Sequence, residues 1–167
     1  MSIFPQHLDD LAEEIITLAR EKNVTLAAAE SCTGGLISAC LTEIPGSSAE
    51  FDSGFTTYSN ASKTNSIGVP AETIKTFGAV SNETAMEMAM GAAKTAETQI
   101  AIATTGIAGP GGGSAEKPVG LVYIGFYLDN PPKIYALQHN FKGDRNAVRM
   151  QTLESALGIL KEELEKL

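Results

Sequence analysis

The fold of this chain is decided by residues 24–36, which read VTLAAAESCTGGL. The apolar first part has the length and flanks of a buried strand, and the chain from Leu36 onward reads as a helix. Ser31 therefore lies on a tight strand-to-helix turn, where the first backbone N–H groups of the helix have no internal partner. Acyl transfer needs such a place, with a nucleophile beside groups that stabilise an oxyanion. The segment alone also fits a helix cap or a general anion site, so these functions stay open.

Helices and strands alternate along the rest of the chain. Apolar periodicity, caps and breakers predict helices at 8–22, 35–43, 70–76 and 81–96 and one opened by Asp144. Runs of β-branched, aromatic or small apolar residues predict strands at 24–29, 51–58, 99–105, 119–128 and 134–141. Alternating elements that end in a hairpin predict an α/β fold, a three-layer α/β/α sandwich with a mixed β-sheet. With no internal repeat or linker, we expect residues 1–167 to form a single domain.

The composition limits the functions open to the chain. Its net charge of −8 and pI near 4.7 argue against a broad nucleic-acid surface. No segment has the apolar length of a membrane span, and the N-terminus lacks the pattern of a secretory signal. Two cysteines, Cys32 and Cys40, indicate a reducing compartment, so we expect a cytoplasmic protein. With only His7 and His139, we expect no histidine-based metal site.

The residues around Ser31 offer two nucleophiles and one base. Cys32 lies at a helix N-terminus, where the pKa of a thiol can fall, so it is an alternative to Ser31. No histidine is placed to activate Ser31, and a serine hydrolase here needs another base. Lys63 follows a predicted strand end, where α/β active sites are built, and burial would leave it a neutral amine. The alternative is an ordinary surface lysine in a solvated loop.

Two further segments can bind anions. Residues 104–114 are rich in glycine, and their N–H groups can form an anion-binding nest, or they can be a flexible connector. Arg145, at the start of the last helix, can bind a phosphate with two parallel bonds, or pair with Asp144 or Glu154 on the surface. The Ser-x-x-Lys spacing of residues 114–117 is expected to be accidental, because Pro118 and the preceding glycines argue against the helix which that motif needs.

These segments together resemble the CinA C-terminal domain family, in its stand-alone nicotinamide-nucleotide amidohydrolases. The resemblance covers nearly the whole chain, and its motifs occur in the family's order. They are AESCTGG (29–35), YSN (58–60) with Lys63, FGAVS (77–81), TGIAGP (105–110) with Gly112 and Gly113, KPVG (117–120), and GDR (143–145) with Val148 and Arg149. The longer members carry an extra N-terminal domain for which these residues leave no room.

The resemblance implies hydrolysis of the carboxamide of nicotinamide mononucleotide to nicotinic acid mononucleotide and ammonia, in NAD recycling. It implies a metal-free Ser/Lys mechanism without a cofactor, with Ser31 as nucleophile and Lys63 as base. Tyr58 and Thr105 are then expected to orient Lys63 or the amide. The expected substrate-binding residues are Glu30, Cys32, Thr33, Gly34, Asn60, Gly109, Gly111, Gly112, Gly113 and Arg145.

Two other functions remain open at this point. One is a non-catalytic nucleotide or phosphate sensor that uses the same turn and glycine-rich loop. The other is an amidase for a different small amide. The expected partner is a small nucleotide substrate, with no nucleic acid and no membrane, and we expect a homodimer or a larger homo-oligomer.

Overall fold

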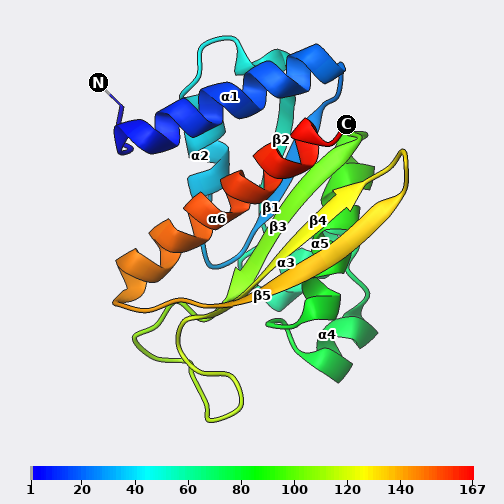
Figure 1. Ribbon diagram of the computed structural model, residues 1–167. Coiled ribbons are helices and arrows are strands. Elements are labelled where there is room, and N and C mark those ends of the chain that lie inside the picture. Colours follow the sequence, from blue (N-terminus) through cyan, green and yellow to red (C-terminus); the bar gives the residue numbers. More distant parts are fainter. Residues whose placement is uncertain (1) are drawn as a thin grey trace.

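The computed structural model describes residues 2–167, and a five-stranded mixed sheet lies at its centre (Figure 1). The strands are β1 (Leu26–Glu30), β2 (Phe51–Thr56), β3 (Ile100–Gly106), β4 (Leu121–Leu128) and β5 (Lys133–Asn140). Their order across the sheet is β2-β1-β3-β4-β5. β1 runs parallel to both β2 and β3, whereas β4 and β5 continue the sheet as an antiparallel hairpin. The carboxyl ends of three parallel strands therefore meet at one edge.

Helices cover both faces of the sheet, which gives the predicted three layers (Figure 1). One face carries α1 (Gln6–Lys22), α2 (Leu36–Thr42) and α6 (Arg145–Glu165), which contact one another. The other face is covered mainly by α5 (Asn82–Ala96), with α3 (Asn60–Ile67) and α4 (Ala71–Phe77) packed beside it. A 3₁₀ turn, Ser47–Ala49, precedes β2. The prediction of an α/β/α sandwich with a mixed sheet is confirmed.

The two faces of the central strands differ in side-chain size. Leu26, Ile100 and Ile102 belong to the larger core under α1, α2 and α6. Alanines of the same strands, among them Ala27 and Ala101, face the core under α5. Small side chains let α5 approach closely, and at Gly125 of β4 an added Cβ would overlap the carbonyl oxygen of Ala85. The apolar, alanine-rich run in the sequence is therefore a strand buried on both faces.

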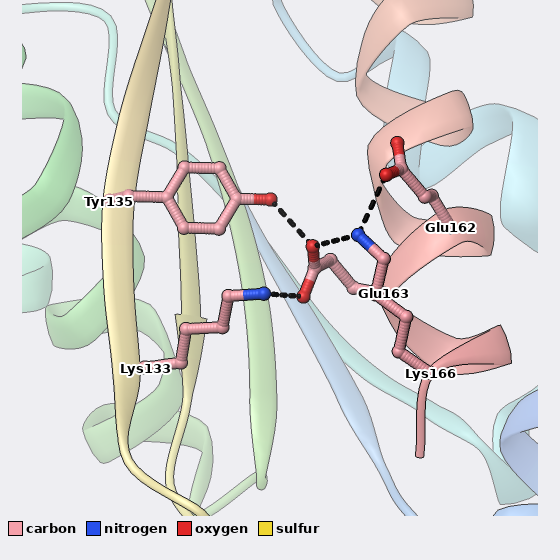
Figure 2. A network of polar contacts seen from close by, with 5 residues as sticks. All are labelled: Lys133, Tyr135, Glu162, Glu163 and Lys166. Carbon is pink, nitrogen blue, oxygen red and sulfur yellow. Dashed lines mark hydrogen bonds and ion pairs between the residues drawn. The ribbon is translucent and has the colours of Figure 1, made fainter.

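A polar cluster fixes the last turns of α6 to the edge strand β5 (Figure 2). The carboxylate of Glu163 accepts hydrogen bonds from Lys133, Tyr135 and Lys166, and Lys166 also bonds Glu162. Glu163 is only 6 % exposed, and a buried carboxylate is costly unless it is paired. These donors compensate its charge. The network lies on the face of α1 and α6 and joins the end of the chain to the sheet.

Most predicted elements are confirmed, with one helix missed and boundaries shifted by a few residues. The polar residues after β2 are helix α3 rather than a solvated loop, with Ser59 as N-cap in a capping box with Ser62. Ser81 and Asp144 cap α5 and α6 as predicted. Within residues 2–167, none of the helices is long and apolar enough to cross a bilayer.

Candidate active site

Ser31 lies at the carboxyl edge of the sheet, at the point where the chain connections diverge. From β1 the chain crosses through α2 to β2, and from β2 it returns through α3, α4 and α5 on the opposite face to β3. Ligands of α/β sheets bind where neighbouring strands send their connections to opposite faces, here β1 through α2 and β2 through α3, α4 and α5. The turn after β1 therefore occupies the usual position of an α/β site.

Lys63 is the direct partner of Ser31. Its Nζ atom lies 3.1 Å from Ser31 Oγ and 2.8 Å from the carbonyl oxygen of Thr57. Lys63 is 1 % exposed and Ser31 9 %, so the pair is shielded from water. The capped first turn of α3 brings the lysine to this place, although it is distant from Ser31 in the sequence. The two residues are brought together as the sequence analysis expects.

The environment of Lys63 favours its neutral form. Burial lowers the pKa of the amine below its usual 10.5, and the nearby Cys32 sulfur opposes that shift only in part. Among residues 2–167, no carboxylate forms an ion pair with this amine. A neutral amine has two N–H bonds and one lone pair. It can donate to Thr57 and accept the proton of the Ser31 hydroxyl, which is the arrangement of a general base.

Cys32 is a poor nucleophile in this setting. The side chain is 5 % exposed, and burial raises the pKa of its thiol to about 11. The thiolate, which is the reactive form, is therefore scarce at neutral pH. Of the two candidate nucleophiles, the geometry and the pKa favour Ser31.

Glu30 is a structural residue, and the prediction that it binds substrate is wrong. Its side chain is fully buried, and its carboxylate accepts hydrogen bonds from the N–H groups of Gly35, Ile37 and Ser38 and from the Ser38 hydroxyl. The first turn of α2 thus already holds an internal anion. A substrate phosphate cannot use the same donors, because Glu30 occupies them.

Arg149, a residue that the sequence analysis did not place in the site, holds the other side of the turn. Its guanidinium donates to the carbonyl oxygens of Cys32 and Thr33 at 3.2 and 2.8 Å. The Thr33 side chain is buried and bonds the Thr104 hydroxyl, and Gly34 donates its N–H to the carbonyl of Ser31. Thr33 and Gly34 therefore build the turn and do not line the pocket.

A pocket of about 200 Å³ opens above the Ser31–Lys63 pair. Its walls contain seven of the predicted residues, which are Ser31, Cys32, Tyr58, Asn60, Lys63, Thr105 and Arg145. Ala79, Val80, Gly106 and Ala108 complete the lining and were not predicted as site residues. No acidic side chain of the described part of the chain lines this pocket, although the full sequence carries a net charge of −8. The local balance of charge favours an anionic or neutral ligand.

Arg145 bridges the mouth of the pocket. One guanidinium nitrogen donates to the carbonyl of Gly109 at 2.8 Å, and the other to the hydroxyl of Tyr58 at 3.1 Å. Neither Asp144 nor Glu154 pairs with it among the described residues, so the surface ion pair considered from the sequence is absent there. Tyr58 is 63 % exposed and bonds Arg145 rather than Lys63, so of its two predicted roles the orientation of the substrate amide stays a prediction. The carbonyl of Thr57 orients the amine instead.

Thr105 likewise does not bond Lys63, and its other predicted role, orientation of the substrate amide, stays a prediction. Thr105 lies near the end of β3, and its hydroxyl donates a hydrogen bond to the carbonyl oxygen of Ala79 at 2.7 Å. Thr105 therefore fixes a pocket wall and does not bond Lys63.

The glycine-rich loop lies mostly outside the pocket. Gly111, Gly112 and Gly113 are exposed and do not line the cavity, and in Figure 1 the loop between β3 and β4 projects beyond the sheet. Gly109 contacts the site through the hydrogen bond that its carbonyl oxygen accepts from Arg145. Ser114 and Lys117 lie outside any helix, which confirms that their spacing is accidental.

No group of three His, Cys, Asp or Glu side chains within residues 2–167 is arranged to hold a metal ion. The chemistry available in this pocket is that of the hydroxyl, the amine, the guanidinium and the backbone. The backbone N–H groups of Cys32 and Thr33 have no protein acceptor among the described residues.

The fold and the pocket define an α/β sandwich with a buried serine–lysine pair at the switch point of a mixed sheet. This chain belongs to the CinA C-terminal domain family, whose model matches residues 8–164. It is 50 % identical over 157 residues to a protein of Clostridium perfringens described as competence-damage inducible. That alignment covers 94 % of this chain but 38 % of the relative, so the chain spans about two fifths of the length of such relatives.

Solved structures agree over nearly the whole chain. The competence/damage inducible protein CihA from Agrobacterium tumefaciens superposes with a TM-score of 0.94 at 46 % identity, over 99 % of both chains. A CinA superfamily protein from Klebsiella pneumoniae superposes with a TM-score of 0.90 at 33 % identity, covering 96 % of this chain and 99 % of the other.

Proposed function

We propose that this domain hydrolyses the carboxamide of nicotinamide mononucleotide to nicotinic acid mononucleotide and ammonia. The observation that carries the proposal is the buried amine of Lys63, which lies 3.1 Å from the hydroxyl of Ser31 and has no carboxylate partner within residues 2–167. Burying a lysine without a counter-charge costs stability and favours its neutral form, and a neutral amine in a pocket is the form that general-base catalysis uses.

The acylation step needs only groups of this pocket. Neutral Lys63 accepts the proton of the Ser31 hydroxyl as Oγ attacks the carboxamide carbon. The carbonyl oxygen becomes an oxyanion, and the backbone N–H of Cys32, which lines the pocket and has no protein acceptor among residues 2–167, stabilises it. The carbon–nitrogen bond then breaks, and protonated Lys63 delivers its proton to the leaving nitrogen, which departs as ammonia.

Deacylation repeats the same proton transfers with water. Lys63, neutral again, removes a proton from a water molecule that attacks the ester carbon. The bond to Ser31 Oγ breaks, and the proton held by Lys63 returns to that oxygen. The product is nicotinic acid mononucleotide, and the site returns to its starting state.

The mouth of the pocket supports a nucleotide rather than a bare amide. The exposed Arg145 guanidinium lies at the rim without an acidic partner among the described residues. An arginine fork suits a phosphate, and a neutral amide alone has no use for it. Arg145 then exchanges its bonds to Gly109 and Tyr58 for bonds to the substrate phosphate.

Release of ammonia on incubation with nicotinamide mononucleotide tests the proposal, with the Ser31→Ala variant as the matched blank. We expect stoichiometric ammonia and nicotinic acid mononucleotide from the unmodified protein only. Binding of the nucleotide without ammonia would identify a sensor. Ammonia from a different small amide, and none from the mononucleotide, would identify another amidase.

A further inference from the structure

Residues 77–80, which connect the end of α4 to α5, form one wall of the pocket, and their carbonyl groups are bonded by side chains rather than by the backbone. Each of the four carbonyl oxygens accepts a hydrogen bond from a side chain. The bonds are those of Lys117 Nζ to Phe77 and to Val80, both 2.8 Å, of Thr105 to Ala79 at 2.7 Å, and of Ser81 and Thr84 to Gly78 at 2.9 and 2.7 Å.

The backbone conformation at Gly78 leaves space for the side chain of Lys117. Gly78 has a φ of 85°, a conformation that favours glycine, and a Cβ added there would lie 2.9 Å from Lys117 Nζ. The ammonium group of Lys117 bonds two carbonyl oxygens and no carboxylate among the described residues. A lysine from the far end of the glycine-rich loop thus fixes a peptide segment that it does not adjoin in sequence.

Fixing the carbonyl groups also fixes the N–H groups. The peptide bonds of this segment are trans, and a trans peptide directs its C=O and N–H to opposite sides. With the oxygens of Gly78 and Ala79 bonded to the protein, the N–H groups of Ala79 and Val80 point away from those donors. Neither N–H has an acceptor among residues 2–167, and both residues line the pocket. Polar backbone groups in a binding pocket without a protein partner are available to a ligand.

We propose that the N–H groups of Ala79 and Val80 bind the carboxamide oxygen of the substrate, with Lys117 and Thr105 as the residues that position them. This inference rests on the amide hydrolysis proposed above and adds donors from a second wall of the same pocket. A carbonyl oxygen accepts more than one hydrogen bond, so these donors add to those of the turn after Ser31. Their bonds strengthen as negative charge develops on that oxygen, which lowers the barrier to attack.

The direct test is an NMR titration of the ¹⁵N-labelled Ser31→Ala variant with nicotinamide mononucleotide, since this variant is expected to bind the substrate without consuming it. We expect the amide protons of Ala79 and Val80 to move downfield as they acquire an acceptor. Shifts at Cys32 and Tyr58 with none at Ala79 and Val80 would overturn this inference and leave the proposed function standing. No shift at any residue, together with no ammonia from the unmodified protein, would overturn both.

Kinetics of Lys117 variants give the second readout. Lys117→Met removes the bonds to Phe77 and Val80, and we expect kcat to fall about tenfold or more with a smaller change in KM, because the oxygen is bound most tightly in the transition state. Lys117→Arg retains two donors and should recover much of that loss. Glu116→Gln, an exposed change on the same loop, is the matched control and should leave kcat unchanged. An unchanged kcat in Lys117→Met, with the same unfolding midpoint, would contradict the positioning role.

Discussion

The turn after Ser31 and the loop between β3 and β4, which carries the glycine-rich segment, look alike in sequence, yet the structure builds them in opposite ways. In the turn, Glu30 bonds the N–H groups at the start of α2, and Arg149 bonds the carbonyl oxygens of Cys32 and Thr33, so charged side chains hold both sides of the turn. In the loop, Gly111 to Gly113 are exposed between two anchors, the carbonyl of Gly109 and the side chain of Lys117.

The comparison shows what a run of small residues does in each setting. In the turn they allow tight packing and hold a nucleophile in one geometry, which chemistry requires. In the loop they let the chain extend away from the sheet. The two anchors connect the loop to Arg145 at the pocket rim and to the pocket wall at residues 77–80. Catalysis is thus expected to depend on the buried turn, and recognition of the rest of the substrate on the exposed rim.

The largest effect should come from removing the nucleophile of the buried turn. We expect Ser31→Ala to lower kcat by several orders of magnitude without unfolding the protein, because a lost nucleophile removes most of the rate enhancement. Cys32→Ser is the matched control and should stay active, since the thiol is protonated at neutral pH. Ammonia release from both variants measures this. An inactive Cys32→Ser beside an active Ser31→Ala would reverse the assignment of the nucleophile.

Changes at Lys63 should separate activity from stability. The neutral amine is the base and its pKa is lowered by burial, so kcat/KM should rise with pH along a limb below 10.5. Lys63→Arg should be inactive, because a guanidinium stays protonated. An active Lys63→Arg would leave Lys63 as an electrostatic anchor only.

The stability of the fold should respond to Lys63 with a defined sign. The unfolded chain takes up the lysine proton below about 10.5 and the folded chain only below the lowered pKa, so stability falls as pH falls through that window. Lys63→Met, which is apolar and of similar length, should therefore raise the unfolding midpoint at neutral pH while abolishing turnover. A lower midpoint in thermal unfolding would show that the amine stabilises the fold.

A substitution at Glu30 tests whether the turn depends on the buried carboxylate that bonds the start of α2. Glu30→Gln leaves donors of α2 without a charged acceptor, and we expect a loss of about 2–3 kcal/mol in the free energy of unfolding. Turnover should fall as well, because Ser31 is the next residue. Urea unfolding and ammonia release measure the two effects. Full activity with unchanged stability would contradict the view that the buried contacts fix the turn.

The smallest effect is expected at the exposed rim. Arg145→Ala removes a charge-assisted contact to phosphate worth about 1.5–3 kcal/mol, or roughly ten- to a hundredfold in use of the mononucleotide. Slow hydrolysis of the phosphate-free riboside should barely change. Measurements of kcat/KM on both substrates show whether Arg145 binds the phosphate. An equal loss of kcat/KM on both would assign Arg145 a catalytic or structural role instead.

Local pattern was enough to predict much of this protein. The order of the elements, the mixed sheet, the strand–turn–helix at Ser31 and the caps at Ser81 and Asp144 all follow from periodicity and end signals between near neighbours in the chain. Helix α3 was missed, because its short polar sequence has no apolar stripe, and its capping box was the only local signal.

The tertiary structure alone decided what each polar residue does. The sequence could not show that Glu30 turns into α2, that Tyr58 bonds Arg145, or that Lys117 reaches the wall at 77–80. Such contacts depend on which strands are neighbours and on which face each connection crosses, and these are set by packing of the whole core rather than by adjacent residues. The sequence by itself determined that a nucleophile lies on the turn at Ser31, and only the folded sheet determined which groups surround it.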